Sequence, residues 1–290
     1  MQVLVGLNKK EIKDYLNYTN SFIIGLKDFS INYLDYSLEE IKKILDDYPH
    51  IEIFISVNKN IFNNELEVLE KILIELDRLP IKGVFFYDLS VLSLWKKNNL
   101  HFNLVWSGEH MTTNYNTCNY YYQKGCEYAY LSSEITLDEI KEIKENSKIK
   151  LISFVFGYPE VSFSKRKLLS NYFEYHNEDK KNEWYRISSD NDNNHSYIIK
   201  ESSIGTRILY GQVMNGIRPF NELKKTLDYA LLNEEFMDHD IFIKGLSVYK
   251  DLLDEKIDEE EAFQKIFELT KSNDTVFYYK KTIYKVKDEK

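Results

Sequence analysis

Residues 148–172 read KIKLISFVFGYPEVSFSKRKLLSNY. Their first part, residues 151–156, is an apolar run of β-branched and aromatic residues, short enough for a strand buried on both faces. Gly157 and Pro159 end this strand, because glycine permits turn dihedral angles and proline cannot donate to a β-ladder. Residues 162–171, which follow, are polar, rich in hydroxyl groups and basic. A strand end that opens onto such a segment predicts a position where an anion can bind.

Similar apolar runs recur at even intervals, with helical patterns between them. Together with residues 151–156, the expected strands are residues 3–7, 22–26, 51–57, 83–87, 102–106, 128–131 and 228–232. This alternation predicts an α/β fold with parallel pairing and right-handed crossovers. A closed (β/α)₈ barrel and a doubly wound open sheet both satisfy it. We favour an irregular TIM-like (β/α)₈ barrel, because the strands recur evenly and no glycine-rich dinucleotide fingerprint is present.

The rest of the chain predicts additions to the barrel. Residues 1–173 are expected to form its first seven βα units, residues 174–215 a polar insertion with a small β meander, and residues 216–290 the last barrel strand, two C-terminal helices and a terminal strand. The insertion is too polar at residues 174–194 to form a core. Its strands are expected at residues 185–188, 196–200 and 206–210, over one mouth of the barrel.

The terminal strand is expected at residues 276–286, VFYYKKTIYKV, where aromatic and basic residues alternate. This period is typical of a packed strand with one charged face. The alternative is a strip that faces RNA, since tyrosine rings stack on bases and lysines meet phosphates.

Composition limits the possible functions. The chain has 43% hydrophobic and 29% charged residues and a formal net charge of −9. That charge disfavours broad attraction to nucleic acid, so RNA would have to bind at a local basic patch. We expect a cytoplasmic protein without membrane association, because the first residues do not resemble a signal peptide and no apolar run reaches about eighteen residues.

The two cysteines, Cys118 and Cys126, have a spacing that fits no tight zinc or iron–sulfur motif. We expect them to be buried, unreactive thiols. The six histidines are scattered without an i,i+4 pair, and the chain has neither an HExxH nor a GxSxG motif. The sequence therefore predicts no metal site and no standard protease machinery.

A family resemblance follows from residues 154–173, FVFGYPEVSFSKRKLLSNYF. This segment resembles the signature region of peptidase family U32, the collagenase-like proteases, some members of which hydroxylate transfer RNA (tRNA) or ribosomal RNA. Typical members carry cysteines in the motif, and two of those positions align here with Glu160 and Lys167. The chain is thus similar to a short, cysteine-poor branch. The resemblance is strongest over residues 82–173 and weaker over residues 196–290.

The resemblance implies that two proteins share the reaction. Without the motif cysteines, no iron–sulfur cluster is expected in this chain, and the sequence does not identify any other cofactor. A redox step that needs such a cluster would be performed by another protein, for which a cysteine-bearing U32 paralogue is the expected partner. The resemblance also makes tRNA a candidate partner, with the segment SKRKLLSNY, residues 164–172, as one candidate contact.

Polar residues at the ends of the expected strands are the candidate site residues, because barrels bind their ligands at that rim. In chain order they are Asn8, Asn58, Asp88, Glu109, His110, Asn114, Glu134 and Glu160, with Lys165, Arg166 and Asn171 just beyond. We assign catalytic roles to Glu134, Glu160, Asp88 and His110, and substrate binding to Asn58, Glu109, Asn114, Lys165, Arg166 and Asn171.

The chemistry of these residue types supports the assignment. Arg166 could hold a carboxylate or phosphate in two hydrogen bonds, with Lys165 and Lys167 adding positive field. Glu134 or Glu160 could act as a base if burial raises its pKa. Each residue could also serve only its local structure: Asp88 and Asn114, for example, stand where helix caps are expected.

Three functions stay open on the sequence. The first is a cluster-lacking component of the system that hydroxylates the wobble uridine of tRNA at position 5. The second is a U32 collagenase-like peptidase. The third is a noncatalytic binding barrel, because a fold alone does not select a function.

Overall fold

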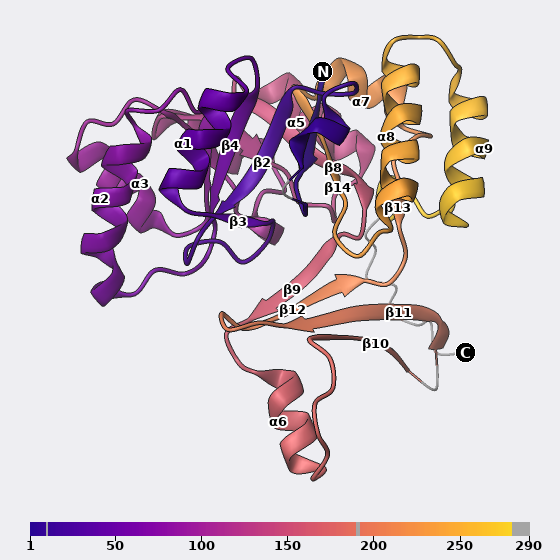
Figure 1. Ribbon diagram of the computed structural model, residues 1–290. Helices are drawn as coiled ribbons and strands as arrows, with labels where there is room; N and C mark the ends of the chain where they lie inside the picture. The colour runs from indigo at the N-terminus through magenta and orange to yellow at the C-terminus, as the bar shows by residue number, and fades with distance from the viewer. Residues whose placement is uncertain (10, 190–191, 280–290) are drawn as a thin grey trace, which may run out of the picture.

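A closed barrel of eight parallel strands forms the body of the molecule, as the computed structural model shows for residues 1–9, 11–189 and 192–279 (Figure 1). The barrel strands are β1 Gln2–Gly6, β2 Ser21–Leu26, β4 Glu52–Val57, β5 Gly83–Phe86, β6 Asn103–Trp106, β7 Cys126–Tyr130, β8 Lys150–Gly157 and β14 Tyr229–Asn233. They pair in chain order, and β14 pairs with both β8 and β1, which closes the ring. The barrel prediction is confirmed, and the open-sheet alternative is wrong.

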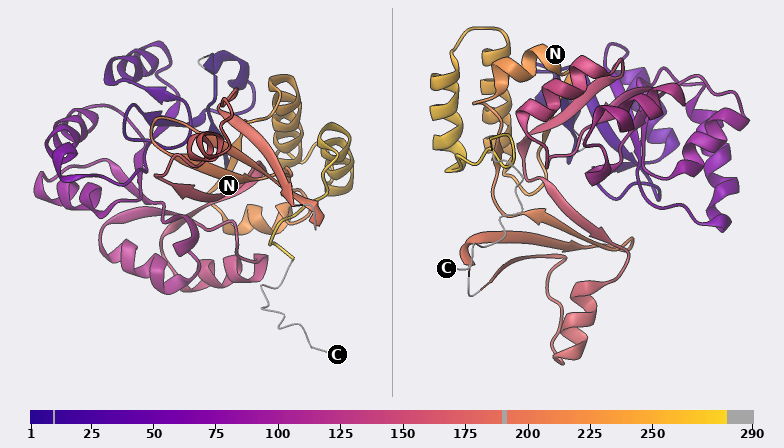
Figure 2. Two further views of the ribbon diagram at one scale, coloured as in Figure 1. Left: turned by 90° about the horizontal axis from the view of Figure 1, so that it is seen from below. Right: turned by 180° about the vertical axis from the view of Figure 1, so that it is seen from behind.

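Helices surround the barrel, and Figure 2 shows them as a ring when the molecule is seen from below. They are α1 Leu38–Asp47, α2 Leu66–Leu76, α3 Leu89–Lys97, α4 Tyr115–Gln123, α5 Leu137–Asn146, α7 Phe220–Thr226 and α8 His239–Leu253, with α9 Glu259–Thr270 packed on α8. Three 3₁₀ helices, η1 Ile12–Tyr15, η2 Asn63–Glu65 and η3 Glu109–Met111, lie in the connections. The caps come from the sequence: in α5, Thr136 and Glu139 form a capping box.

Aromatic side chains fill the barrel interior. The ring of Phe54 meets the edges or faces of Phe85, Tyr128 and Tyr229 from three other strands, at centroid distances of 5.5, 5.7 and 5.3 Å. These T-shaped contacts are the arrangement that ring quadrupoles favour. The barrel is therefore a packed core rather than a pore, and a ligand must bind at its end.

A second, antiparallel sheet lies across the carboxyl end of the barrel strands (Figures 1 and 2). Its strands, in the order β10, β11, β12 and β9, are Trp184–Ser189, Asp192–Glu201, Thr206–Tyr210 and Glu160–Ser164. Helix α6, Leu168–Tyr175, projects from it away from the barrel. Two short strands, β3 Asp35–Tyr36 and β13 Met214–Asn215, pair with β2 and β8.

The three strands expected in the meander are present, and the first of them, β10, lies within residues 174–194, the range of the expected polar insertion. The segment of residues 164–172, which was expected to be a basic loop, instead begins at the last residue of β9 and contains the start of α6. Backbone pairing of β9 with β12 explains the strand, since a hydrogen-bonded ladder does not need an apolar run. The division of the chain at residues 173 and 215 stays a prediction.

The expected terminal strand is also wrong where the structure describes it. Residues 276–279 form a turn, and residues 280–286 of that prediction lie outside the described residues. Tyr278 is buried, and its hydroxyl donates to the carbonyl oxygen of Phe154 at 2.9 Å. The backbone nitrogen of Leu137 donates to the carbonyl oxygen of Tyr278 at 3.0 Å. The chain after α9 therefore runs back against the barrel instead of adding to a sheet.

Candidate functional site

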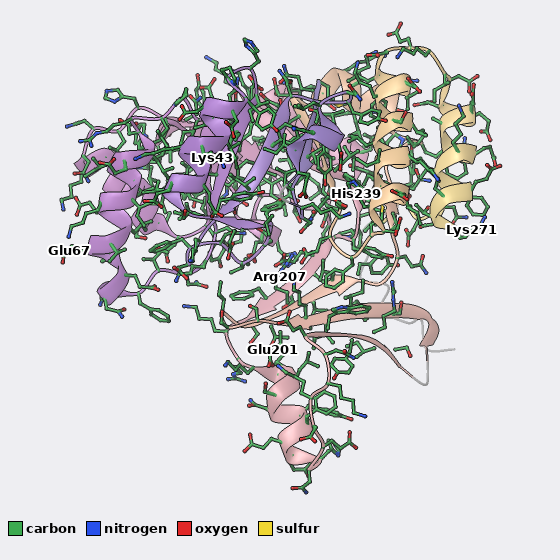
Figure 3. All side chains as sticks on the ribbon, in the orientation of Figure 1. Lys43, Glu67, Glu201, Arg207, His239 and Lys271 are labelled. Atoms are coloured by element: carbon green, nitrogen blue, oxygen red, sulfur yellow. The ribbon has the colours of Figure 1, made fainter. Side chains whose placement is uncertain are left out.

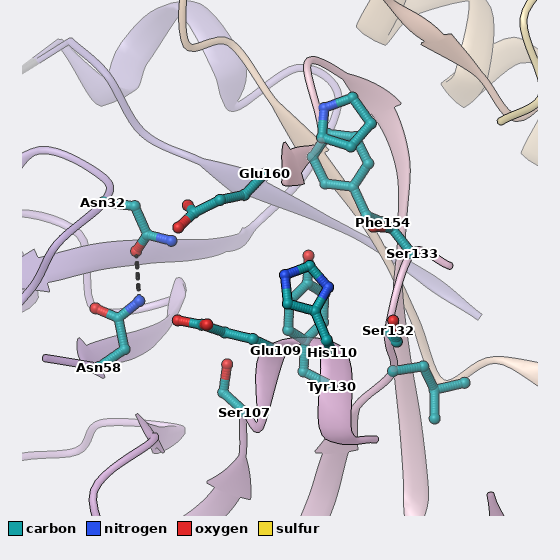
Figure 4. A pocket seen from close by; sticks show the side chains of 12 residues that line it. Asn32, Asn58, Ser107, Glu109, His110, Tyr130, Ser132, Ser133, Phe154 and Glu160 are labelled. Atoms are coloured by element: carbon teal, nitrogen blue, oxygen red, sulfur yellow. Dashed lines mark hydrogen bonds between the residues drawn. The ribbon is translucent and has the colours of Figure 1, made fainter. Parts of the chain in front are cut away.

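A small polar cavity lies at the carboxyl end of the barrel strands, under the second sheet (Figure 4). It has a volume of about 60 Å³ and is lined by Asn32, Asn58, Ser107, Glu109, His110, Tyr130, Leu131, Ser132, Ser133, Phe154, Pro159 and Glu160. These residues follow several different strands, and they meet because parallel strands of one barrel end at the same rim. A volume of this size holds a few water molecules or one small group.

Two asparagines form one wall. The side-chain amide of Asn58 donates to Asn32 Oδ1 at 3.0 Å, and Asn58 Oδ1 accepts from the backbone nitrogen of Ile31 at 3.0 Å and from Ser30 Oγ at 3.2 Å. Asn58 thereby fixes the loop after β2. Figure 4 shows the amide nitrogen of Asn32 turned towards the carboxyl group of Glu160.

Glu109 has unusual surroundings. Burial, together with the negative charge of Glu160, raises the pKa of Glu109 from 4.5 to about 7, and the nearby charges of His110 and Arg207 only partly oppose this. Its backbone φ of 48° lies in the left-handed region, which is strained for a residue with a Cβ atom. Glu109 is therefore held in place at some energetic cost and carries a proton over much of the neutral pH range.

Arg207, on β12, is the buried cation of the site (Figure 3). Its Nε and Nη2 atoms donate to Glu160 Oε2 at 3.0 and 2.7 Å, and its Nη1 atom donates to both oxygens of Glu235 at 2.8 and 2.9 Å. Lys200 Nζ reaches Glu235 Oε1 at 3.3 Å. Burial alone would raise the pKa of Glu235, but the charges of Arg207 and Lys200 outweigh it and hold that pKa below its ordinary value.

Glu160 has one satisfied oxygen and one unsatisfied one. Oε2 accepts both bonds from Arg207, whereas Oε1 is buried and has no hydrogen-bond partner within the described part of the chain. Burial raises the pKa of the Tyr130 hydroxyl beside it well above its usual range, and the charges of Glu160 and Glu109 add to the effect. A buried acceptor without a donor is unfavourable, so this oxygen is suited to a ligand N–H or O–H group.

The structure brings together some of the residues expected at the site. Asn58, Glu109, His110 and Glu160 line the cavity, and Glu134 lies beside it, with Oε2 3.5 Å from His110 Nδ1. Their catalytic or binding roles stay predictions.

Asp88 and Asn114 do not line this cavity and have local structural partners. Asp88 caps α3 by accepting from the backbone nitrogen of Ser90 at 2.9 Å, and it also accepts from Ile61 at 3.0 Å. Asn114 caps α4 by accepting from Thr117 at 2.9 Å. The capping alternative stated for both residues is what their hydrogen bonds support.

The basic residues after Glu160 also lie outside the cavity. Lys165 Nζ sits 3.4 Å from the ring centroid of Phe62, and Arg166 and Asn171 are exposed. The expected convergence of Arg166 with the strand-end carboxylates is therefore wrong. The physical reason is β9, which pairs with β12 and carries the chain away from the mouth before Arg166 is reached.

Several residues at the mouth were missed by the sequence analysis, chiefly Arg207, Glu235 and Asn32. Glu235 could have been found, because it follows the eighth strand just as the chosen residues follow theirs. Asn233, at the end of that strand, accepts a hydrogen bond from Asn8 at 2.8 Å. Arg207 had a weaker signal: it is the single charged residue in the otherwise apolar and hydroxyl-bearing run TRILY.

The cysteines match their expectation. Cys118 and Cys126 are buried and unpaired with each other, and burial raises the pKa of each thiol to about 12. Among residues 1–9, 11–189 and 192–279, no group of three or more histidine, cysteine, aspartate or glutamate side chains is arranged to hold a metal ion. The prediction that no iron–sulfur cluster binds here stays a prediction.

The arrangement can do two kinds of chemistry. Glu109 can give or take a proton near pH 7, and the free oxygen of Glu160 can accept a hydrogen bond from a bound group. Arg207 keeps Glu160 in one position by two bonds from a planar guanidinium. These are the features of a site that binds a polar group and moves a proton at it.

Comparisons with known proteins point to one family. The model of peptidase family U32 matches residues 10–286. The tRNA hydroxylation protein P2 of Bacillus subtilis is 28% identical, over 91% of this chain and 92% of its own length. A protein of Methanocaldococcus jannaschii named as an uncharacterized protease is 24% identical, over 93% of this chain and 70% of its own.

Two further matches are partial or distant. The tRNA hydroxylation protein P1 of Bacillus subtilis is 24% identical, over 57% of this chain and 40% of that protein. A solved structure of a U32 peptidase covers 80% of this chain and 92% of its own, with 12% identity and a TM-score of 0.47. None of the helices in the described part of the chain is long and apolar enough to cross a membrane.

Proposed function

The chain belongs to peptidase family U32, and from this membership we propose that it is a component of tRNA hydroxylation that acts at position 5 of the wobble uridine. The observation that carries the proposal is the end-to-end match to tRNA hydroxylation protein P2, which covers about nine-tenths of both chains. A match over about nine-tenths of both chains is too long to be limited to the barrel or to the second sheet.

The cavity supports this proposal through its chemistry. Uracil is a flat ring with one N–H group and two carbonyl oxygens, so it needs both an acceptor and donors from its site. Glu160 Oε1 is a buried acceptor without a donor. The amide of Asn32 and the protonated form of Glu109 are donors on the same side of the cavity (Figure 4). We assign binding of the ring edge to Glu160 and Asn32, and proton transfer to Glu109.

The reaction replaces the C5–H bond of uracil by C5–OH, which is a two-electron oxidation, so a co-substrate or a partner protein must supply the oxygen atom and accept the two electrons. We assign to this chain the binding of the base and the movement of protons. We assign the cluster-dependent part to a cysteine-bearing U32 paralogue. The match to a second, longer hydroxylation protein from the same bacterium that has protein P2 supports a system with more than one U32 component.

The tRNA itself is expected to lie against the second sheet and α6. Lys165, Arg166 and Lys167 stand together at the start of α6 and are exposed, in a chain whose formal net charge is −9. Phosphate groups are attracted to such a local cluster even when the protein as a whole is acidic. Because the proposed substrate is tRNA, we assign this activity to the cytoplasm.

Deletion of the gene, followed by mass spectrometry of tRNA nucleosides, tests the proposal. We expect the hydroxylated wobble uridine to be lost and to return with the wild-type gene. It should not return with Glu160→Gln, in which an amide group replaces one of the two acceptor oxygens, whereas the control Glu145→Gln at an exposed position of α5 should restore it. Unchanged hydroxylation in the deletion strain would reject the proposal.

A peptidase is the second candidate, favoured by one observation. Glu109 and Glu160 form a carboxyl pair of which one member holds its proton near pH 7, an arrangement that can serve acid–base hydrolysis. It predicts peptide cleavage by the purified protein that disappears in both Glu109→Gln and Glu160→Gln. Such cleavage, combined with normal tRNA hydroxylation in the deletion strain, would replace the first proposal. Absence of both activities would favour a noncatalytic binding barrel.

A further inference from the structure

A larger cavity adjoins the small one, between the barrel rim, the second sheet and the chain after α9. Its volume is about 370 Å³, and it shares Ser133, Pro159 and Glu160 with the small cavity. The other lining residues are Glu134, Val161, Tyr197, Tyr210, Val276 and Phe277. Ligand sites in proteins usually have volumes of roughly 300–1,000 Å³, so this cavity can hold a ligand that the small one cannot.

Aromatic side chains form its walls. Tyr197 on β11 and Tyr210 on β12 are paired across the two strands, with ring centroids 6.3 Å apart and ring planes at 73°. The hydroxyl of Tyr210 donates to Asp274 Oδ2 at 2.8 Å, which fixes that ring between the sheet and the chain after α9. Val276 and Phe277 complete the apolar lining. Such walls offer contact to a flat ring, because an aromatic side chain can stack on any base.

The polar end of the cavity is the part it shares with the small cavity. Glu160 stands there with its buried, unpartnered Oε1 atom, and Ser133 and Glu134 lie next to it. A ligand that enters between Tyr197 and Phe277 therefore meets a hydrogen-bond acceptor at its leading edge. The small cavity, with Glu109, lies directly beyond that edge.

We propose that the larger cavity receives a single nucleobase, unstacked from its RNA, with the ring between Tyr197 and Phe277 and an edge N–H group donating to Glu160 Oε1. This inference rests on the proposed function and adds the position of the base. Enzymes that modify a base inside RNA or DNA take it out of its stack into a pocket of this kind, with aromatic or apolar walls and polar groups at the base edge.

The guanidinium group of Arg186 at the rim of the larger cavity can bind the phosphate of a nucleotide whose base lies inside. Arg186 on β10 donates to the carbonyl oxygen of Gly211 at 2.9 Å, and its guanidinium lies 5.6 Å from the ring centroid of Tyr158. Gly211 and Tyr158 directly follow and precede the lining residues Tyr210 and Pro159 in the chain. Arg186 is exposed, so it can meet a phosphate of the same nucleotide.

Photo-crosslinking tests the position of the base. The chain, isolated with its partners from its own cells, is bound to tRNA transcribed with 4-thiouridine and irradiated with near-ultraviolet light. We expect crosslinks that peptide mapping assigns to Tyr197, Tyr210 or Phe277. Tyr197→Ala should lower both their yield and the affinity for the tRNA about tenfold, since one stacked base contributes that much, whereas Tyr197→Phe should retain both.

The matched control is Tyr120→Ala, because Tyr120 is 53% exposed on α4, one of the helices around the barrel, and lies outside the cavity. It should change neither the cavity crosslinks nor their yield. Crosslinks found only outside the cavity, with wobble hydroxylation still dependent on the gene, would overturn this inference and leave the proposed function standing. No crosslink anywhere, with hydroxylation unchanged in the deletion strain, would overturn both.

Discussion

Glu109 and Glu160 meet at one cavity but have different surroundings. Arg207 donates two hydrogen bonds to Glu160, whereas Glu109 has the charge of Glu160 near it and is largely removed from water. Burial and the charge of Glu160 raise the pKa of Glu109 to about 7, so Glu109 can supply a proton, whereas Glu160 supplies an acceptor oxygen.

Glu109 makes the stability of the protein depend on pH. Its pKa is about 7 in the folded chain and near 4.5 when unfolded, so the folded chain binds the proton more tightly. This contribution is fully present below pH 4.5 and is lost as the pH rises through 7, a change of about 3 kcal/mol in the free energy of unfolding. Glu109→Gln should remove it, as urea unfolding at several pH values would measure.

Between pH 5 and pH 8, the free energy of unfolding of the wild type should fall relative to that of Glu109→Gln. Parallel stability curves for the two proteins would show that Glu109 does not bind its proton more tightly in the folded chain.

Arg207 is expected to be essential for folding as well as for the site. Arg207→Met leaves Glu160 and Glu235 buried without their cation, so the free energy of unfolding should fall by about 3–5 kcal/mol. Arg207→Lys, which keeps the charge but not the planar donors, should lose less. The control is Arg166→Met at an exposed position, with a change within about 0.5 kcal/mol. If Arg207→Met lowered the free energy of unfolding by no more than the control does, the ion pairs of Arg207 with Glu160 and Glu235 would not stabilise the fold.

Strand β9 decides where the basic residues lie. It leaves the barrel after Gly157, whose φ of 122° is one that residues with side chains rarely adopt and whose position leaves no room for a Cβ atom, which would come 2.3 Å from the carbonyl oxygen of Asn233. Pairing with β12 then carries Lys165, Arg166 and Lys167 to the start of α6. The glycine turn and one strand thus separate the cationic cluster from the cavity.

This position predicts a role in RNA affinity rather than in chemistry. Replacing Lys165, Arg166 and Lys167 together by glutamine should weaken tRNA binding and lower the slope of log K against log salt concentration by about 2, because each lost phosphate contact removes about 0.7–0.9. Filter binding at several salt concentrations measures the slope.

The control replaces Lys42, Lys43 and Lys71, three exposed lysines on α1 and α2. It changes the net charge equally and should leave the slope unchanged. If both triple variants lose the same slope, the attraction depends on net charge and not on the segment at the start of α6.

The last described residues, 272–279, connect several parts of the molecule at the carboxyl end of the barrel. After α9 the chain crosses the barrel end: Ser272 Oγ donates to Val213 at 2.6 Å, the carbonyl oxygen of Asp274 accepts from Asn215 at 2.8 Å, and Tyr278 bonds to β8. This segment also forms part of the larger cavity. Barrel, second sheet and chain end therefore form the cavity jointly.

Truncation separates the contribution of this segment from that of the residues beyond it. A chain that ends at Lys271 loses the burial of Val276 and Tyr278, so its free energy of unfolding should fall by about 3 kcal/mol or more. It should also lose the cavity crosslinks. A chain that ends at Tyr279 keeps the segment and is the comparison in both measurements. Equal behaviour of the two truncations would show that residues 272–279 do not stabilise the mouth.

Local patterns were sufficient for the barrel and for part of the site. Each barrel strand is a short apolar run, and the residues after it must lie at the rim, so Asn58, Glu109, His110 and Glu160 could be selected from the sequence. The same rule could not tell which polar residues would instead cap a helix, as Asp88 and Asn114 do.

By itself, then, the sequence determined the alternation of strands and helices and favoured a barrel with these rim residues, because burial and hydrogen bonding within each βα unit depend on neighbouring residues. Only the tertiary structure decided that Arg207, rather than Arg166, is the cation at the mouth and that the chain after α9 helps to form the larger cavity. The physical reason is distance along the chain: Arg207 meets Glu160 and Glu235 only when β12 crosses the barrel end. No local pattern encodes the pairing of a charge with partners 47 and 28 residues away.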